Sequence, residues 1–334
     1  MSENYEPQVT EQAPDEPSEH RQLHDFRSVF FGPEGLRAGW GLALFLLLRE
    51  LLKSCIYPLL LLFFPLRSRQ NGLFLPQNLV VSESAALLCV VIATVVMGRI
   101  ENRPMADFGA GGPHRLRNFL AGLGWGFALL SLLVLILHAT GKLMFDGLQL
   151  HGTTALYYGA VWLVGFVLVG LFEESLSRGY TQATLARGMG GLFRRLGSPR
   201  SDAAGFWTAA LLTSFGFAFG HLDNTGESPI GLIAAGLIGL VFCLSLWRTG
   251  SLWWAIGFHA SWDWAQSFLY GVADSGTMAQ GHLLATHPVG RSILSGGSTG
   301  PEGSVFVIPI AALSAVVILI TLPSRRIQIA RGEQ

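Results

Sequence analysis

Long apolar stretches separated by short polar ones dominate the pattern of this sequence. A helix needs about 20 apolar residues to cross hydrocarbon about 30 Å thick, and most of these stretches approach that length. They lie at 40–64, 79–97, 119–139, 155–172, 206–219, 230–247, 252–270 and 305–322. The fifth is short and contains glycine. The pattern predicts an all-α fold, a polytopic membrane helix bundle with about eight transmembrane helices.

Composition agrees with this fold class. Half of the 334 residues are hydrophobic and only 13% are charged, which is typical of a multi-pass membrane protein rather than a soluble domain. The lipid bilayer is therefore the first expected partner. No stretch resembles a nucleotide-binding loop or a nucleic-acid-binding patch, so we expect no nucleic acid. The three cysteines lie within apolar stretches and lack the spacing of a metal site.

The basic residues alternate between connections. Arginines gather at 99–117, at 178–200, at 248 and at 325–331, whereas the connections between these are poor in them. By the positive-inside rule, the arginine-rich connections and both termini are cytoplasmic. Arg67 and Arg69 are exceptions, because they fall in a connection that this topology places outside. We expect the protein to lie in the cell membrane.

The same pattern divides the chain into five segments. They are a disordered cytoplasmic tail (1–36), N-terminal transmembrane helices (37–150), a core (151–270), an external Gly/Ser-rich loop (271–303), and a last transmembrane helix with a cytoplasmic tail (304–334). The first segment is acidic and contains several prolines, so it does not have the composition of a signal peptide. Gly122 and Gly126 in the third stretch have the four-residue spacing of close helix contacts.

Two adjacent acids end the fourth apolar stretch. Glu173 and Glu174 would each cost roughly 2.5–3.5 kcal/mol at membrane depth, so such acids are usually paired, protonated or functional. Arg178 lies one helical turn after Glu174, and the two would form an ion pair. Glu173 points elsewhere on the helix and is left to face a cavity. In the alternative interpretation, both acids lie at the cytoplasmic interface and are solvated.

Histidines occur in two of the following stretches. His221 ends the fifth stretch, and a histidine at a helix end is commonly interfacial. His259 lies well inside the seventh, with Asp263 one turn later on the same helix face. The two could also satisfy each other as a structural pair. Together with Glu173, these residues predict a polar active site inside a bilayer.

The order and spacing of these residues resemble a known family. Glu-Glu-x-x-x-Arg, then Phe-x-x-x-His, then His-x-x-x-Asp, on successive hydrophobic helices, are similar to the motifs of the CAAX prenyl protease and bacteriocin-processing family, also called the abortive-infection family, of intramembrane endopeptidases. The resemblance covers about 155–270. The prenyl proteases have asparagine where this chain has Asp263, and a carboxylate cannot donate a hydrogen bond unless it is protonated.

The resemblance implies an endopeptidase that hydrolyses a peptide bond of a membrane-associated or leader-bearing protein. It implies catalytic residues Glu173, His221, His259 and Asp263, and supporting residues Glu174, Arg178 and Phe217. The first two catalytic residues would hold and deprotonate a water, and the other two would face the oxyanion. With aspartate at 263, we expect Asp263 to orient His259, whose imidazolium form would stabilise the oxyanion.

Alternatives remain for the cofactor and for the function. We favour a metal-free site, but the same four catalytic residues could instead bind zinc, although the sequence lacks His-Glu-x-x-His. The alternative function is a non-proteolytic membrane binding, immunity or transport protein with the same fold. Arg49, Glu50 and Lys53 interrupt the first stretch without an assigned role, and Glu83 is interpreted as interfacial. The sequence does not identify the substrate.

Overall fold

The computed structural model describes residues 26–32, 35–66 and 73–323. The two expected tails lie mostly outside this part of the chain, and Arg67 and Arg69 lie outside it as well. The α-helices are α2 (Ala38–Phe63), α3 (Pro76–Ile100), α4 (Arg115–Ala139), α5 (Gly152–Glu174), α6 (Gln182–Arg195), α7 (Ser201–Phe219), α8 (Pro229–Thr249), α9 (Trp253–Trp264), α10 (Ser292–Ser295) and α11 (Val307–Thr321). The strands are β1 (Phe31–Gly32), β2 (Gly35–Leu36), β3 (Leu143–Leu148) and β4 (Leu284–Pro288).

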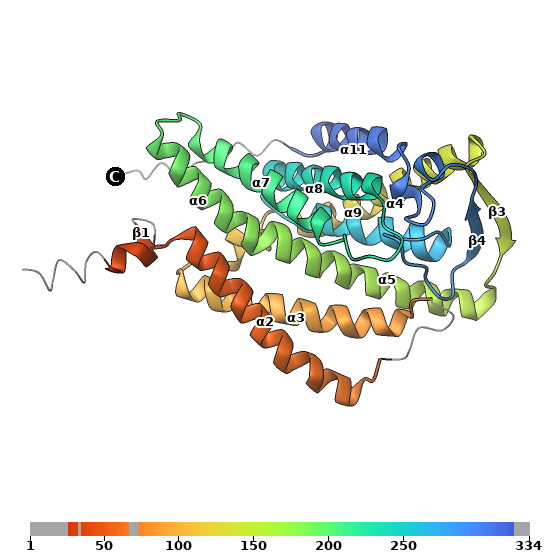
Figure 1. The fold of residues 1–334 in the computed structure, drawn as a ribbon, viewed down its shortest axis with the longest axis horizontal. Helices are drawn as coiled ribbons and strands as arrows, with labels where there is room; N and C mark the ends of the chain where they lie inside the picture. Colours follow the sequence, from red (N-terminus) through yellow and green to blue (C-terminus); the bar gives the residue numbers. More distant parts are fainter. Residues whose placement is uncertain (1–25, 33–34, 67–72, 324–334) are drawn as a thin grey trace, which may run out of the picture.

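The architecture is the expected all-α membrane bundle, and each of the eight apolar stretches falls largely within helix (Figure 1). The count of eight spans is not confirmed. Within the described residues, four helices are long and apolar enough to cross a membrane. They are Pro76–Ile100, Arg115–Ala139, Gly152–Arg195 and Pro229–Thr249. The others are shorter or carry charge: α11 has 15 residues, and three charged residues interrupt α2 near its middle.

The central helix α9 is held by glycines on its neighbours. A Cβ atom added at Gly122 or Gly126 of α4 would overlap the carbonyl oxygen of Trp254 or Phe258 on α9. One added at Gly170 of α5 would lie 2.9 Å from another α9 carbonyl oxygen, that of Ile256. The backbones therefore approach at distances that only glycine permits. The expected packing role of Gly122 and Gly126 is confirmed.

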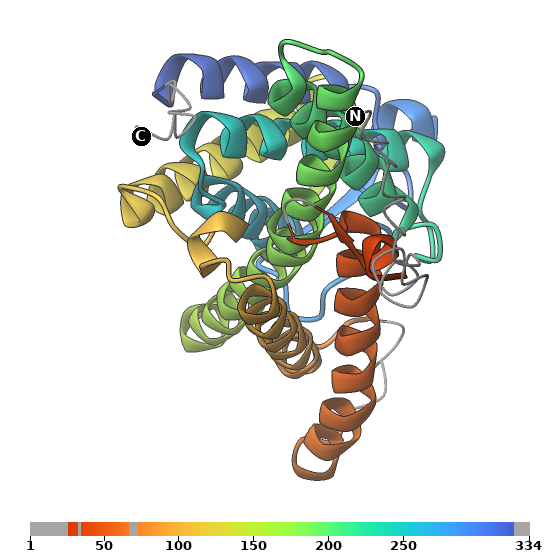
Figure 2. The same cartoon turned by 90° about the vertical axis from the view of Figure 1, so that its left-hand side faces the viewer.

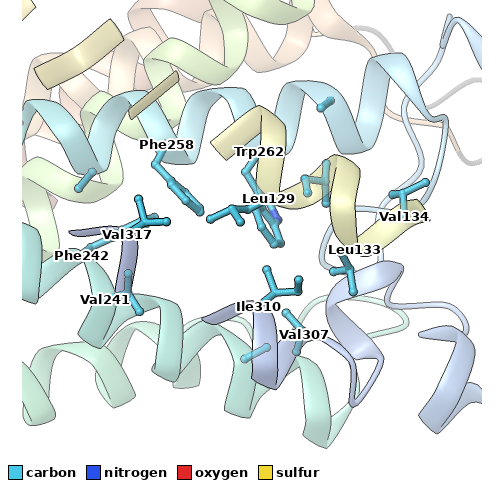
Figure 3. Close-up of a cluster of buried hydrophobic side chains, with 14 of the residues drawn as sticks. Leu129, Leu133, Val134, Val241, Phe242, Phe258, Trp262, Val307, Ile310 and Val317 are labelled. Atoms are coloured by element: carbon cyan, nitrogen blue, oxygen red, sulfur yellow. The ribbon is translucent and has the colours of Figure 1, made fainter. Parts of the chain in front are cut away.

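The largest hydrophobic core lies between α4, α8, α9 and α11. Phe258 and Trp262 of α9 point into it and meet Leu129 of α4 (Figure 3). His259 and Asp263 follow each of these residues by one position, which turns them about 100° around the helix axis. Burial of Phe258 and Trp262 on one face of α9 thus fixes the direction in which the polar residues His259 and Asp263 point.

One long helical segment carries the acidic pair. After α5 the chain continues as η2, a π-helical turn at Ser175–Thr181, and then as α6, so that Gly152–Arg195 forms a continuous helical stretch of 44 residues. Gly179 departs from helical geometry inside η2, with ψ at −110°. Such wide turns often occur at functional sites. Helical structure therefore resumes beyond the polar stretch that follows Glu174, with a kink at Gly179.

The segment 271–303 is more ordered than the expected loop. It contains β4, α10 and the short 3₁₀ turn η4 (Pro301–Gly303). β4 pairs antiparallel with β3, with Met144 opposite His287. We call 271–303 the cap, because its residues close one end of the cavity described below. The β3–β4 pair lies at the end of the molecule opposite the α6–α7 connection (Figure 1).

Helix α2 lies at the edge of the bundle. It packs on α3 and α6, and one of its ends extends away from the remaining helices (Figure 2). Arg49 and Glu50 form an ion pair of 2.9 Å on this helix. Among the described residues, neither these two nor Lys53 lines the main cavity, so the structure assigns them no role in it.

Candidate active site

A cavity of about 260 Å³ opens between α3, α5, α7, α8, α9 and the cap. Its walls include all four residues that the sequence predicted as catalytic, namely Glu173, His221, His259 and Asp263. Glu173 ends α5, His221 follows α7, and the other two lie on α9. Three separate parts of the chain thus deliver their polar groups to one space.

His259 is surrounded by carboxylates. Its Nδ1 lies 3.1 Å from Oε1 of Glu174, and its Nε2 lies 3.4 Å from Oδ2 of Asp263 and 3.6 Å from Oε2 of Glu173. Carboxylates accept hydrogen bonds, and an imidazole donates from both nitrogens only when it is protonated. The short contact is on the Nδ1 side. The Nε2 side has longer contacts and faces the cavity.

Glu174 and Arg178 form the ion pair that the sequence predicted. Arg178 Nη1 lies 2.8 Å from Glu174 Oε1, and both side chains are fully buried. The same Glu174 oxygen is the partner of His259, so this acid links the arginine to the histidine. That link was not predicted. A buried charge of this kind persists because it has a close partner of opposite sign.

Phe217 supports this buried arginine. The guanidinium carbon of Arg178 lies 4.7 Å from the centre of the Phe217 ring and 5.6 Å from that of Phe242. These distances are typical of cation–π contacts. On α8, Gly239 leaves room for the guanidinium, since an added Cβ would lie 2.6 Å from Nη2. The aromatic residue of the Phe-x-x-x-His motif thus stabilises the charge that holds Glu174.

His221 has a defined orientation. Its Nδ1 lies 2.9 Å from the backbone carbonyl oxygen of Phe217, one turn earlier. A carbonyl oxygen only accepts, so Nδ1 carries the proton and Nε2 is left as an acceptor. His221 lines the cavity. It can therefore accept a proton from, or hold, a water molecule there.

Comparison with protein families identifies the part of the chain that contains these residues. Residues 155–265 match the family described as type II CAAX prenyl endopeptidase Rce1-like. We call residues 155–265 the Rce1-like domain, after the family to which this segment is similar. The match confirms the resemblance noted from the motifs. Comparison with curated proteins gives no match, and comparison with solved structures gives none.

The Rce1-like domain holds every residue proposed for the site, from Glu173 to Asp263. Three further carboxylates line the same cavity from outside the domain: Glu83 on α3, and Asp274 and Glu302 in the cap. From the sequence we interpreted Glu83 as interfacial and did not place it in a cavity. The expectation of an external loop at 271–303 likewise did not place Asp274 or Glu302 in a cavity. No local spacing marks them, because only the tertiary fold brings them to the site.

The two cap carboxylates are held by neutral donors. Trp262 Nε1 donates to Glu302 Oε1 over 2.7 Å, and Ser275 Oγ donates to Glu302 Oε2 over 3.3 Å. Ser267 Oγ donates to Asp274 Oδ2 over 3.1 Å. Burial raises the pKa of Asp274 well above its usual range, and the neighbouring Asp263 and Glu302 raise it further.

The sequence-based alternative, a zinc site held by the same four residues, stays a prediction. In the part of the chain that the structure describes, no three His, Cys, Asp or Glu side chains form a group that could hold a metal ion. A ligating imidazole presents an unprotonated nitrogen to the metal, whereas both nitrogens of His259 face carboxylate oxygens.

Proposed function

We propose that this protein is an intramembrane endopeptidase in which Glu173 activates a water to hydrolyse a peptide bond of a membrane-associated or leader-bearing protein. The observation that carries the proposal is the shared cavity, which Glu173, His221, His259 and Asp263 all line. The Rce1-like match supports a peptidase of the CAAX type. The apolar helices support a location in the membrane.

The first step is attack of water on the substrate carbonyl carbon. His221 Nε2 and the Glu173 carboxylate hold the water, and Glu173 takes one of its protons as the new C–O bond forms. The carbonyl π bond breaks and leaves an oxyanion on the tetrahedral intermediate. His259 Nε2–H donates to this oxyanion, because its contacts to carboxylates are long enough for a substrate oxygen to replace them.

The second step releases the products. The C–N bond breaks as Glu173 returns its proton to the leaving amine, which restores the carboxylate. Glu174 keeps Nδ1 of His259 in place throughout, and Arg178 holds Glu174 from the other side. Asp263 orients His259 through its 3.4 Å contact with Nε2 before the substrate oxygen takes the place of that contact.

The test is the substitution Glu173→Gln in the full-length protein. Glutamine cannot accept the proton of water, so we expect cleavage to fall by about 10²–10⁴-fold. Glu50→Gln on α2 is the matched control, because Glu50 does not line the cavity. Quantitative labelling of new peptide N-termini in membranes that contain each variant measures cleavage and identifies substrates. Undiminished cleavage in Glu173→Gln would contradict the role of Glu173, and the absence of cleavage by the unsubstituted protein would favour the non-proteolytic alternative.

A further inference from the structure

The cavity holds more carboxyl groups than the catalytic residues account for. Asp274 and Glu302 line it together with Glu83, Glu173 and Asp263. Among its described lining residues none is lysine or arginine, and Arg178 is already paired with Glu174. Within the described chain, neither Asp274 nor Glu302 forms an ion pair with a basic side chain; both are held by hydroxyl and indole donors.

The position of these two carboxylates is fixed by the fold. Gln266 Nε2 donates to the carbonyl oxygen of Ala273 over 2.8 Å, which ties the start of the cap to the end of the α9 segment. Gly300 has a φ of +98°, and a Cβ there would overlap the same Ala273 carbonyl oxygen. The two ends of the cap therefore meet at Ala273. Asp274 and Glu302 are adjacent to this contact.

The remainder of the cavity suits an extended peptide. Phe74, Trp162 and Phe166 form an apolar wall, continuous with the space in front of Glu173. Apolar walls with a few placed polar groups are typical of ligand sites. The cap carboxylates lie at one end of a cavity that already has catalytic groups and apolar walls, so they act on whatever peptide enters it.

We propose that Asp274 and Glu302 bind a lysine or arginine side chain of the substrate beside the scissile bond, so that the cavity selects cationic peptides. This rests on the proposed function. A basic side chain supplies the opposite charge that the cap carboxylates lack, and ion pairs shielded from water contribute strongly to specificity. A substrate with an acidic side chain at the same position binds more weakly, because its carboxylate would lie beside those of Asp274 and Glu302. Both residues lie outside the Rce1-like domain, so this selectivity belongs to the cap of this chain.

The test uses three fluorescent decapeptides that differ at one central position, which is lysine, norleucine or glutamate. Norleucine keeps the length and apolar stem of lysine and removes its charge. We expect purified full-length protein to bind the lysine peptide at least about tenfold more tightly than the norleucine peptide, and the glutamate peptide most weakly. Fluorescence anisotropy measures binding independently of cleavage.

Two single variants locate the effect. Asp274→Asn and Glu302→Gln should each reduce the lysine preference to less than about threefold, because each removes one carboxyl group that can pair with the lysine ammonium. Asp146→Asn is the matched control; this acid is exposed and pairs with His287 away from the cavity. Equal binding of the lysine and norleucine peptides by the unsubstituted protein, including no binding of either, overturns the proposal even if a variant fails to fold.

The same peptides separate this proposal from the proposed function. Lysine-selective binding without cleavage of any peptide contradicts the peptidase and leaves the cation site standing. Cleavage of lysine and norleucine peptides with equal kcat/KM supports the peptidase and contradicts the cation site. A lysine preference that survives in both cap variants also contradicts it.

Discussion

At the scale of single residues, one oxygen atom of Glu174 links Arg178 to His259. Oε1 of Glu174 is the partner of Arg178 Nη1 at 2.8 Å and of His259 Nδ1 at 3.1 Å. Because Arg178 is itself held between the rings of Phe217 and Phe242, the orientation of His259 depends on residues of four helical segments. In the proposed mechanism the second glutamate of the motif thus positions His259, whereas the first acts on water.

The aspartate at 263 provides the sharpest residue-level prediction. We expect Asp263→Asn to retain cleavage within about tenfold of the unsubstituted protein, because an asparagine amide can donate directly to the oxyanion. His221→Ala should lose about 10²–10⁴-fold, since no other imidazole replaces it beside the water. Cleavage of one membrane substrate by the purified variants measures both effects.

Metal analysis of the same samples is the control for that experiment. If the site held zinc, weakening a ligand at 263 would lower metal content and activity together. Stoichiometric zinc in the unsubstituted protein, lost with activity in Asp263→Asn, would contradict the metal-free mechanism.

At the scale of elements, the glycines of α4 determine where α9 lies and hence where His259 points. Gly126→Val would place side-chain atoms on the carbonyl oxygen of Phe258. We expect it to lower stability by about 1–3 kcal/mol, the usual cost of overpacking, and to reduce cleavage. Gly124→Val is the matched control on the same helix, because nothing lies within 4 Å of a Cβ at Gly124. Thermal unfolding in detergent compares them; equal midpoints would contradict the packing role.

Local patterns in the sequence predicted some of these elements and not others. The apolar stretches fell within helices, and the motif residues Glu173 and His259 could be found because each lies in a recognisable spacing. The π-helical turn after α5 has no such signal, since its wide geometry depends on what packs around it. Asp274 and Glu302 were missed because the fold of a glycine-rich segment, rather than its spacing, brings them to the cavity.

At the scale of the whole molecule, the α6–α7 connection, with Arg194, Arg195 and Arg200 at or beside it, and the cap lie at opposite ends (Figure 1). The positive-inside rule then places the cap outside the cell. We expect Ser298→Cys, at an exposed cap position, to react with a membrane-impermeant maleimide on intact cells. Arg195→Cys, exposed near the end of α6, should react only after lysis. The unsubstituted protein corrects for its own three cysteines, and the reverse labelling pattern would contradict this orientation.

The walls of the cavity come from positions as far apart as Phe74 and Val307. During synthesis, the chain emerges from its N-terminus, so Glu173 and His221 enter the membrane well before Asp274 and Glu302 exist. A chain that has reached only the end of α9 contains the hydrolytic groups but not the cap that closes around them. If the proposed function and the proposed cation site hold, selective cleavage therefore begins only after the cap has been synthesised, and a shorter nascent chain does not discriminate between the peptides around it.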